Sequence, residues 1–530
     1  MRKGIFLLII IVSELLITHV YSTELILNDS ISLQKGQVSS FDPRDAYHAN
    51  HILMVKQLYE GLTDIDENGT VIPTLASSWE TNNGKTWTFY LRPDIYFAPS
   101  QCVQSKQSRR VVADDVLFTF ERLLEPASKS LGVSYFLNID GAKAFHEGTT
   151  KTITGITVKA DDTLRFSLQS PDYGFPNRLS LSYVGISSRK ADHCMQKKTY
   201  PHPLGTGPFI LSEYIPNKSI KLQRNTEYWG YRGNTHLPMT DMITVSLTAD
   251  DNNALAQFRS GKVDFLDLTL PLERQIADMK FPFTPIIESA PWGQLNYLMF
   301  NLETLPDKNL RRAISASIDR SMLQRILGSQ GQVTDSIYPP ALFPDLAHIP
   351  PPPFINQSVK ITSNQKPLRL IAFDDVLSRA IVEQVARDLK RIGLTVNIQA
   401  VPFPVLVDRL NKKDYDMLQL YWGPLYTDIR HFIVPFLTNS FPPDGNNFNH
   451  YSNPTVDQLV RSSESLENAN IKNIFSTLQE LLLADAPMAP LYFGNQVRIS
   501  NGKFKMPLHP LGYRIYKLAA PSDQTIEKQP

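Results

Sequence analysis

The apolar positions of the chain change their period repeatedly, so helices and strands are expected to alternate. From Arg379 to Ile392, apolar residues recur at helical spacing, which predicts an amphipathic helix. They are Ile381, Val382, Val385, Leu389 and Ile392. Gly393 is expected to end this helix, and residues 394–398 (Leu-Thr-Val-Asn-Ile) follow as a strand. A helix–turn–strand unit of this kind is typical of an α/β domain.

Other segments fit the same alternation. Residues 85–92 alternate between apolar and polar side chains, as in a half-buried strand. Residues 117–123 are expected to form a helix after Ala113-Asp114-Asp115, because acidic side chains in the first turn favour the helix dipole. Pro350–Pro353 are expected to be extended and to lie on the surface. No internal repeat of fixed period is visible.

The first 22 residues have the pattern of an export signal. Arg2 and Lys3 precede an apolar stretch from Ile5 to Leu16, and Ser22 is a small residue suited to cleavage. The alternative is a transmembrane anchor, but the stretch is shorter than the roughly 20 residues that span a bilayer. We therefore expect cleavage after Ser22 and a protein that works in the periplasm.

Length and charge limit the organisation of the chain and its partners. About 508 residues remain after residue 22, more than one core holds, so two or three compact units are expected. The formal net charge is +1 and no long block carries one sign, which argues against nucleic acid and anionic membranes as partners. The two cysteines, Cys102 and Cys194, are expected to be either bridged to each other or buried.

The sequence offers little for catalysis or metal binding. His193 and Cys194 are adjacent, but no acid or serine stands at a recognisable spacing from them. The motifs of α/β-hydrolases, zinc proteases and P-loop NTPases are absent. Gly205-Thr206-Gly207 lacks the third glycine and the following helix of a nucleotide loop, so a structural turn is expected. We expect a protein that is no enzyme and has no cofactor or metal.

An ordered series of short motifs opens the part of the chain after residue 22. It consists of Phe41-Asp42-Pro43, Tyr59-Glu60-Gly61-Leu62, Pro73, Leu75-Ala76, Ser78-Trp79-Glu80, Gly84-Lys85, Trp87-Thr88-Phe89 and Leu91-Arg92. Its order and spacing resemble the opening of the substrate-binding proteins of peptide and nickel ABC importers, the family 5 extracellular solute-binding proteins. Those proteins are receptors without a reaction, so the resemblance directs attention to ligand contacts.

The resemblance continues through nearly all of the remaining chain. Further blocks are Ala113-Asp114-Asp115-Val116, Gly205-Thr206-Gly207-Pro208-Phe209, Asn296-Tyr297-Leu298-Met299-Phe300-Asn301, Tyr451-Ser452-Asn453-Pro454 and Pro490-Leu491-Tyr492. Relatives usually carry a threonine where this chain has Val112, so Asp114 is expected to accept hydrogen bonds from the free amides of that helix start. No cysteine follows the apolar core of the signal, so the lipid anchor of some relatives is not expected.

The resemblance implies an α/β protein with the two-lobed periplasmic binding protein fold and a hinged ligand cleft. Lobe I would hold residues 23–293 and the return segment 497–530, with an extra subdomain near 62–189. Lobe II would hold residues 294–496. The two crossings between the lobes, near Gln294 and Gln496, would form the hinge.

Tyr47, His48 and Ala49 fall where relatives place ligand contacts on lobe I. An exposed loop is the alternative for Tyr47 and His48. The gap between Asp42-Pro43 and Glu60-Gly61-Leu62 fits the peptide-binding pattern without an insertion, which favours the cleft lining. The motif around Glu60 is itself expected in packing and a turn rather than in ligand contact.

The segment 421–428, Tyr-Trp-Gly-Pro-Leu-Tyr-Thr-Asp, is the most informative about the ligand. In peptide-binding relatives, an aspartate three residues after the tryptophan pairs with the α-ammonium of the peptide. Here that position is Leu425. An unpaired desolvated ammonium costs ~3–5 kcal/mol, so this pairing cannot operate from Leu425. Either Asp428 replaces it, or the ligand presents no free amine there; a turn or cap carboxylate is the remaining interpretation of Asp428.

Four other residues of lobe II are candidates for ligand contact by their positions. Phe403 falls where relatives can place an aromatic ring over the ligand, with core packing as the alternative. Gln419 falls where some relatives carry a carboxylate-binding arginine, with a plain strand residue as the alternative. Arg379 could supply a replacement cation, although a solvated helix start is favoured. Trp422 is the best stacking candidate, and a core tryptophan is the alternative.

Three functional hypotheses follow. The first is the periplasmic receptor of an ABC importer, a monomer that binds oligopeptides in the cleft and docks on membrane permease subunits. The second keeps the transport role but replaces the peptide with a nickel–chelator complex, haem or another compound without a free amine. The third is a periplasmic chaperone or adhesin that retains the receptor fold.

Overall fold

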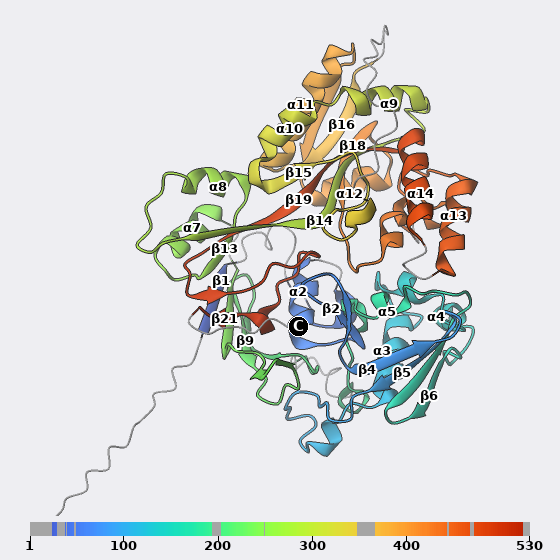
Figure 1. Cartoon of the computed structure of the whole chain (residues 1–530), viewed down its shortest axis with the longest axis vertical. Coiled ribbons are helices and arrows are strands. Elements are labelled where there is room, and N and C mark those ends of the chain that lie inside the picture. The colour runs from blue at the N-terminus through green and yellow to red at the C-terminus, as the bar shows by residue number, and fades with distance from the viewer. Residues whose placement is uncertain are drawn as a thin grey trace, which may run out of the picture.

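The structure, a computed structural model, has two lobes that share one sheet (Figure 1). The described residues are 24–28, 38, 40–46, 49–192, 203–247, 250–346, 366–442, 445–466 and 471–522. Lobe I lies in the lower part of Figure 1 and lobe II in the upper part. Among the described helices, none is long and apolar enough to cross a bilayer.

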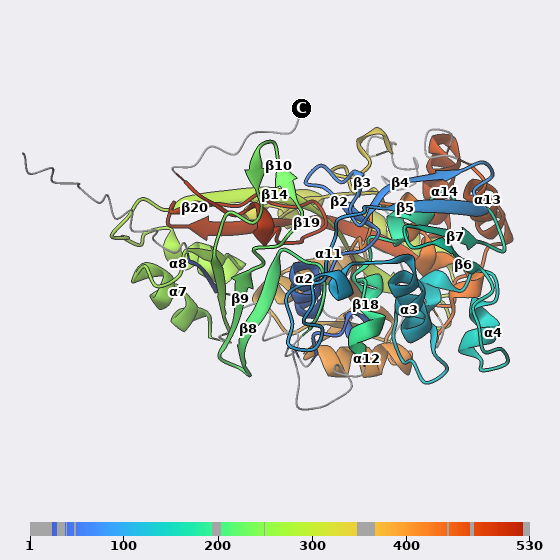
Figure 2. The same cartoon turned by 90° about the horizontal axis from the view of Figure 1, so that it is seen from below.

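Two long antiparallel strands connect the lobes. They are β14 (Ile286–Phe300) and β19 (Met488–Ser500), and Figure 2 shows them side by side across the molecule. β14 leads from lobe I into lobe II, and β19 leads back. Their register shifts between Pro291 and Leu295, where three residues of β14 stand opposite Gly494 of β19. This bulge interrupts the hydrogen-bond ladder between the two lobes.

Lobe II is built on three strands that extend the sheet from β14. In order outward they are β18 (Met417–Trp422), β16 (Leu368–Phe373) and β17 (Val396–Val401), while β15 (Gly331–Val333) pairs with β19. The three strands are parallel to one another, and β18 is antiparallel to β14. Their carboxyl ends therefore point back toward lobe I.

The helix expected over 379–392 is α11 (Val376–Arg391). The Asp375 side chain caps its start by accepting a hydrogen bond from a first-turn amide at 2.9 Å. Gly393, with a φ of +93°, follows its end, as a left-handed position requires. The strand expected over 394–398 begins two residues later than predicted, as β17, parallel to β16.

Further helices cover the sheet of lobe II. They are α9 (Lys308–Ser317), α10 (Arg320–Leu327), α12 (Phe403–Asn411), α13 (Pro454–Glu464) and α14 (Lys472–Asp485). The buried apolar side chains form two cores, one that includes Leu418 and Phe475 and one that includes Leu370 and Val385. α12 begins just after the carboxyl end of β17, so its first turn lies at the edge that faces lobe I.

Lobe I continues the same sheet beyond β19. Its strands, in order from β19, are β13 (Phe265–Asp267), β1 (Glu24–Asn28), β12 (Met242–Ser246), β9 (Ser219–Arg224) and β8 (Phe209–Ile215). The other elements of this part are α2 (Ala49–Leu58), α7 (Asp251–Arg259), α8 (Leu270–Ile276), β10 (Tyr231–Arg232), β11 (Thr235–His236), β20 (Phe504–Lys505) and β21 (Ala520–Pro521).

A separate four-stranded sheet lies within lobe I. Its order is β4 (Ala76–Thr81), β5 (Thr86–Leu91), β7 (Thr163–Ser167) and β6 (Ile156–Ala160), all antiparallel. The hairpin β2 (Thr63–Ile65) and β3 (Val71–Pro73) and the helices α4 (Ala142–His146) and α5 (Phe175–Arg178) lie near it in sequence. β5 is the strand predicted from the alternation over 85–92, and its buried Trp87 and Phe89 face the core of lobe I.

The first helix of this part is α3 (Ala113–Leu124), and its start corrects one expectation. Asp115, not Asp114, caps the helix: its carboxylate accepts a hydrogen bond from the Val112 N–H at 3.0 Å. Asp114 instead forms an ion pair with Arg189 at 2.7 Å. The prediction was wrong because Val112 has no acceptor of its own, and the third helical residue is the one that reaches back to that amide. Burial raises the pKa of Asp115 to about 6.

Several sequence predictions concern residues outside the described part of the chain. Among them are the export signal over 1–22, the extended Pro350–Pro353 and the state of Cys194. Cys102 is disulfide-bonded. Since its expected partner Cys194 is not described, the pairing of the two cysteines stays a prediction.

Candidate functional site

The edge of the lobe II sheet that faces lobe I carries three aromatic side chains. Phe373 ends β16, Tyr421 lies one residue before the end of β18, and Phe403 begins α12. The rings of Phe373 and Phe403 stack nearly parallel with centroids 6.2 Å apart, and those of Phe373 and Tyr421 are 5.3 Å apart. We call Phe373, Phe403 and Tyr421 the aromatic strip.

Apolar groups around the aromatic strip are open to solvent. Phe403 is 40% exposed, Val405 on the same helix 41%, and Val376 at the start of α11 50%. Exposed apolar side chains that occur together indicate an interaction site, whereas single ones need no explanation. The strip and these neighbours therefore offer exposed apolar groups at the edge of lobe II that faces lobe I, and they include the sequence candidate Phe403.

Arg379 lies on the first turns of α11, beside this surface. Its guanidinium Nε is 2.8 Å from the Asp374 carboxylate, and both side chains are about half exposed. An exposed ion pair of this kind stabilises a protein by ~0–1 kcal/mol. Arg379 thus lies at a solvated helix start, and its guanidinium is already paired with the Asp374 carboxylate.

Gln419 lies inside β18, opposite Leu298 of β14, and is buried. Its Oε1 has no hydrogen-bond partner among the residues that the structure describes. An unpaired buried amide oxygen costs about 1–3 kcal/mol. Asn296 of β14 is its diagonal neighbour on the same face of the sheet, because it pairs with Tyr421 two residues further along β18. Two neutral amides thus lie next to the aromatic strip.

Trp422, at the end of β18, stacks on His431. The two ring centroids are 5.0 Å apart, and the indole N–H donates to the His431 backbone oxygen at 3.0 Å. His431 is 1% exposed, and burial lowers its pKa to about 4. Its Nε2 donates to the backbone oxygen of Gly423 at 3.1 Å. Tyr135 of lobe I packs 6.5 Å from the imidazole, so Trp422 belongs to an aromatic stack at the boundary of the lobes.

The residues that follow Gly423 and Pro424 lie against lobe I. The backbone oxygen of Leu425 accepts a hydrogen bond from the Tyr513 hydroxyl at 2.6 Å, and that of Thr427 accepts one from the Asn177 amide at 3.1 Å. The Leu425 side chain packs against the core of lobe I. This segment is therefore a direct contact between the lobes.

Asp428 ends this contact segment, and protein groups engage both of its carboxylate oxygens. Oδ1 accepts a hydrogen bond from the Arg430 N–H at 2.9 Å, and the Arg430 guanidinium lies 3.1 and 3.2 Å from the two oxygens. Arg430 also donates to the backbone oxygens of Ser463 and Leu466. In this arrangement Asp428 is the cap of a short helical turn, η9 (Ile429–Phe432).

The lobe I candidates for ligand contact are described only in part. Tyr47 and His48 lie outside the described residues. Ala49 begins α2, drawn in blue in Figure 1, and its backbone alone is described. The proposed contacts of these three residues therefore stay predictions.

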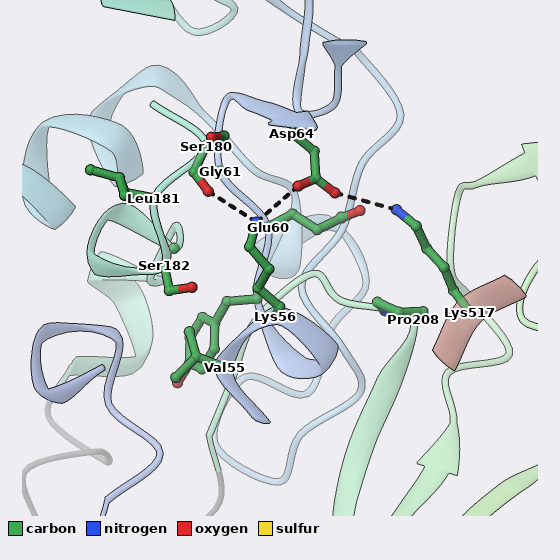
Figure 3. A pocket seen from close by; sticks show the side chains of 12 residues that line it. Val55, Lys56, Glu60, Gly61, Asp64, Ser180, Leu181, Ser182, Pro208 and Lys517 are labelled. Carbon is green, nitrogen blue, oxygen red and sulfur yellow. Dashed lines mark hydrogen bonds and ion pairs between the residues drawn. The ribbon is translucent and has the colours of Figure 1, made fainter. Parts of the chain in front are cut away.

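A small polar cavity lies inside lobe I (Figure 3). Its volume of about 20 Å³ is room for one water molecule, far too little for a peptide. Along its wall, Lys56 contacts the Asp64 carboxylate at 2.9 Å and the Ser180 backbone oxygen at 3.0 Å, and Lys517 lies 3.7 Å from Asp64. Glu60 accepts hydrogen bonds from three neutral side chains here, so its motif has the packing role predicted for it.

Among the described residues, the glycine motif and the acidic and histidine side chains provide neither a phosphate site nor a metal site. The Gly207 N–H donates to the Leu58 backbone oxygen at 3.0 Å, and a side chain on Gly205 would overlap that oxygen. The motif is the structural turn that was predicted. Within the described ranges, no three His, Cys, Asp or Glu side chains are grouped so that they could hold a metal ion.

Sequence reasoning missed the lobe I side of the contact between the lobes. Asn177, Tyr135 and Tyr513 belong to no motif, and Asn177 is 250 residues from its hydrogen-bond partner. Nothing in the local pattern could have brought these residues together. Phe373 and Tyr421 did carry a signal, because each lies at the end of a strand whose carboxyl end faces the boundary of an α/β unit.

Comparison with known proteins places the chain among receptors for solutes. A family model described as bacterial extracellular solute-binding proteins, family 5 Middle, matches residues 70–443. The peptide transport periplasmic protein SapA of Salmonella typhimurium is 25% identical over 491 residues, which cover 86% of this chain and 85% of SapA. The periplasmic murein peptide-binding protein MppA of Escherichia coli is 24% identical over 498 residues, which cover 89% and 88%.

Solved structures share the fold. The periplasmic binding protein DppA of Helicobacter pylori, in complex with the peptide STSA, superposes with a TM-score of 0.76 at 18% identity and covers 95% of this chain and 98% of its own. OppA of Haemophilus influenzae, in complex with the peptide RPPGFSPFR, superposes with a TM-score of 0.73 at 20% identity and covers 95% and 99%. The two-lobed arrangement is thus that of periplasmic binding proteins.

Proposed function

The chain belongs to family 5 of the bacterial extracellular solute-binding proteins, and on that premise we propose that it is the periplasmic receptor of an ABC importer for oligopeptides. The family consists of binding proteins rather than enzymes. Relatives named for peptide transport and murein peptide binding, and neighbours solved with bound peptides, support a peptide as the ligand. The ligand binds between the lobes and is handed to permease subunits in the membrane.

The exposed apolar surface around the aromatic strip is the observation that carries this proposal. It lies at the carboxyl ends of β16, β17 and β18, on the side of lobe I and next to the bulge that interrupts β14. Ligands of open α/β sheets bind at the carboxyl ends of the strands. Phe403 and the neighbouring Val376 and Val405 offer apolar contacts to the side chains of an extended peptide.

Neutral amides would form hydrogen bonds with the polar backbone groups of the same ligand. A peptide presents backbone N–H groups, and the unpaired Oε1 of Gln419 can accept a hydrogen bond from such a donor. Tyr47, His48 and Ala49 would approach the peptide from lobe I. Hydrogen bonds to the peptide backbone provide affinity without reading the sequence of the ligand.

The lobes are proposed to divide where the chain crosses between them. Lobe I then holds residues 23–293 and 497–530, with the subdomain near 62–189, and lobe II holds residues 294–496. The bulge between Pro291 and Leu295 supports a hinge near Gln294, because a strand whose ladder is interrupted bends more easily than a paired one.

Export and assembly complete the proposal. Residues 1–22 are the signal that directs the protein to the periplasm, and the absence of a cysteine after their apolar core argues for release without a lipid anchor. The protein acts as a monomer that docks on the permease. A nickel–chelator complex or haem as the ligand, and a chaperone or adhesin role, are the alternatives that the following experiment separates.

Native mass spectrometry of the protein purified from its own periplasm tests the function. We expect a ladder of bound peptides, and a rise in melting temperature when the emptied protein meets a peptide mixture. Ligand at a hundred times its dissociation constant adds about 2.7 kcal/mol of stability. A metal complex, haem or unfolded protein in place of peptides would overturn the proposal.

A pair of variants tests the binding surface. Phe403→Ala should weaken peptide binding roughly twofold to tenfold, the range of a lost aromatic contact. Tyr231→Ala is the matched control, because Tyr231 is an aromatic residue of lobe I that is 61% exposed and lies on β10, away from the strip. Isothermal titration with a copurified peptide measures both. Equal affinities of the two variants would exclude Phe403 from the site.

A further inference from the structure

Lobe I contacts each of the four consecutive lobe II residues from Leu425 to Asp428. The contacts come from α5 with the preceding Gly174, and from Tyr513 in the segment that follows β19. Figure 1 shows α5 on the side of lobe I that faces lobe II. Protein groups make these contacts on both sides, so they favour the closed arrangement of the lobes whether or not a ligand is bound.

Two of the four residues take part in hydrogen bonds between the lobes. Leu425 and Thr427 accept theirs through their backbone oxygens. The charge of Arg178 on α5 acts on the Tyr426 hydroxyl: burial raises the pKa of this tyrosine, and Arg178 acts against that shift. Tyr426 is buried, and its ring packs edge-on against Tyr135 of lobe I at 6.0 Å. Separation of the lobes would leave each of these polar groups without its partner.

The fourth residue, Asp428, meets lobe I at Gly174. The φ of Gly174 is −85°, which any residue adopts, so the local backbone does not require glycine there. A Cβ at this position would nevertheless overlap an oxygen of the Asp428 carboxylate. The lack of a side chain at Gly174 is therefore explained by the contact between the lobes.

We propose that Gly174, Asn177, Arg178 and Tyr513 form a clasp on residues 425–428 that closes the lobes without ligand, and that Gly174 is the positioning residue that allows it. The proposal rests on the two-lobed fold and not on peptide as the ligand. The open form, which admits the ligand, is then a minor population of the ligand-free protein. The observed affinity and association rate are reduced in proportion to that fraction.

Small-angle X-ray scattering of the ligand-free protein tests the clasp. The protein is freed of copurified ligand by unfolding, dialysis and refolding, and Gly174→Val is compared with the parent chain. We expect a larger radius of gyration for Gly174→Val, because its side chain keeps Asp428 away from lobe I. Gly423→Ala is the matched control from the same loop: its added Cβ has no atom closer than 3.8 Å, so the parent scattering curve is expected.

Identical curves for the parent chain and Gly174→Val would overturn the clasp, as would a parent chain that is open without ligand. Should Gly174→Val fail to fold by circular dichroism, the double variant Asn177→Ala/Tyr513→Phe replaces it. That variant removes two hydrogen bonds between the lobes without adding bulk, and the same increase is expected. Scattering without ligand is independent of the peptide assay, so failure of the clasp leaves the proposed ligand untouched, and the reverse also holds.

Discussion

Two neighbouring parts of lobe II end at the boundary with lobe I and differ in what covers them. Phe403 of the aromatic strip and its neighbours Val376 and Val405 are exposed, and Phe373 and Tyr421 are half-buried. Residues 425–428, which follow β18 after a short turn, are covered by α5 and Tyr513 of lobe I. Both parts belong to one edge of one sheet, so the sheet itself does not decide which part is covered.

The difference lies in the chemistry of the two surfaces. The exposed part offers an aromatic ring and aliphatic groups, and the neutral amide of Gln419 is buried beside them. The covered part contains a buried ion pair, Asp428 with Arg430, whose geometry leaves little freedom. A buried pair needs fixed partners, since either charge alone would be costly. Under the proposed function, apolar and neutral groups would hold the ligand, whereas the charged pair holds the protein in shape.

The largest expected effect follows from removing one partner of the buried pair. Arg430→Ala should lower the free energy of unfolding by about 3–5 kcal/mol, because it leaves Asp428 charged and buried. Arg379→Ala, in the exposed pair with Asp374, should cost at most about 1 kcal/mol. Urea unfolding followed by circular dichroism measures both. Similar losses would show that the two surfaces do not differ in the way the structure indicates.

The next effect concerns pH and His431. Because burial lowers its pKa to about 4, the folded protein binds fewer protons at this site than the unfolded chain between about pH 6.5 and pH 4. The contribution of His431 to the free energy of unfolding is therefore fully present above about pH 6.5. It falls by about 3 kcal/mol in total as the pH drops to about 4.

His431→Phe isolates this contribution. The substitution keeps an aromatic ring against Trp422 and removes the titrating group, at the loss of the hydrogen bond to Gly423. Its melting temperature should therefore fall less steeply than that of the parent chain between pH 6.5 and pH 4. Parallel curves would mean that the pKa of His431 in the folded protein is close to its ordinary value. The side chain would then be more exposed to water than the structure shows.

The sequence predicted those parts of the fold that depend on local pattern. The spacing of apolar residues gave α11 to within three residues at its start, and the alternation over 85–92 gave β5. The order of the motifs indicated the family and, through the family, the two lobes. The cap of α3 was assigned to the wrong acid because Asp114 and Asp115 are adjacent, and only the folded helix shows which carboxylate reaches the Val112 amide.

The candidate site was predictable only in part, for a different reason. Phe403 and Gln419 could be named from their positions along the chain, and the structure describes where each lies. What covers residues 425–428 could not be named, because Asn177 and Tyr513 are distant in sequence and their roles arise from closure of one lobe on the other. The sequence pattern within one lobe contains no information about which residues of the other lobe will contact it.

The smallest expected effect distinguishes the clasp from ordinary packing. Tyr513→Phe removes the hydroxyl that donates to Leu425 but keeps the ring over which the Lys56 ammonium lies at 5.0 Å. One lost hydrogen bond should lower the free energy of unfolding by about 1 kcal/mol. The scattering curve should shift toward that of Gly174→Val, but less, since other hydrogen bonds between the lobes remain, among them that of Asn177 with Thr427. Tyr231→Phe, at an exposed position on β10, controls for loss of a hydroxyl as such. A Tyr513→Phe protein that is less stable yet no more open would assign this tyrosine to packing, and the covered surface would then owe its closure to Gly174 and α5 alone.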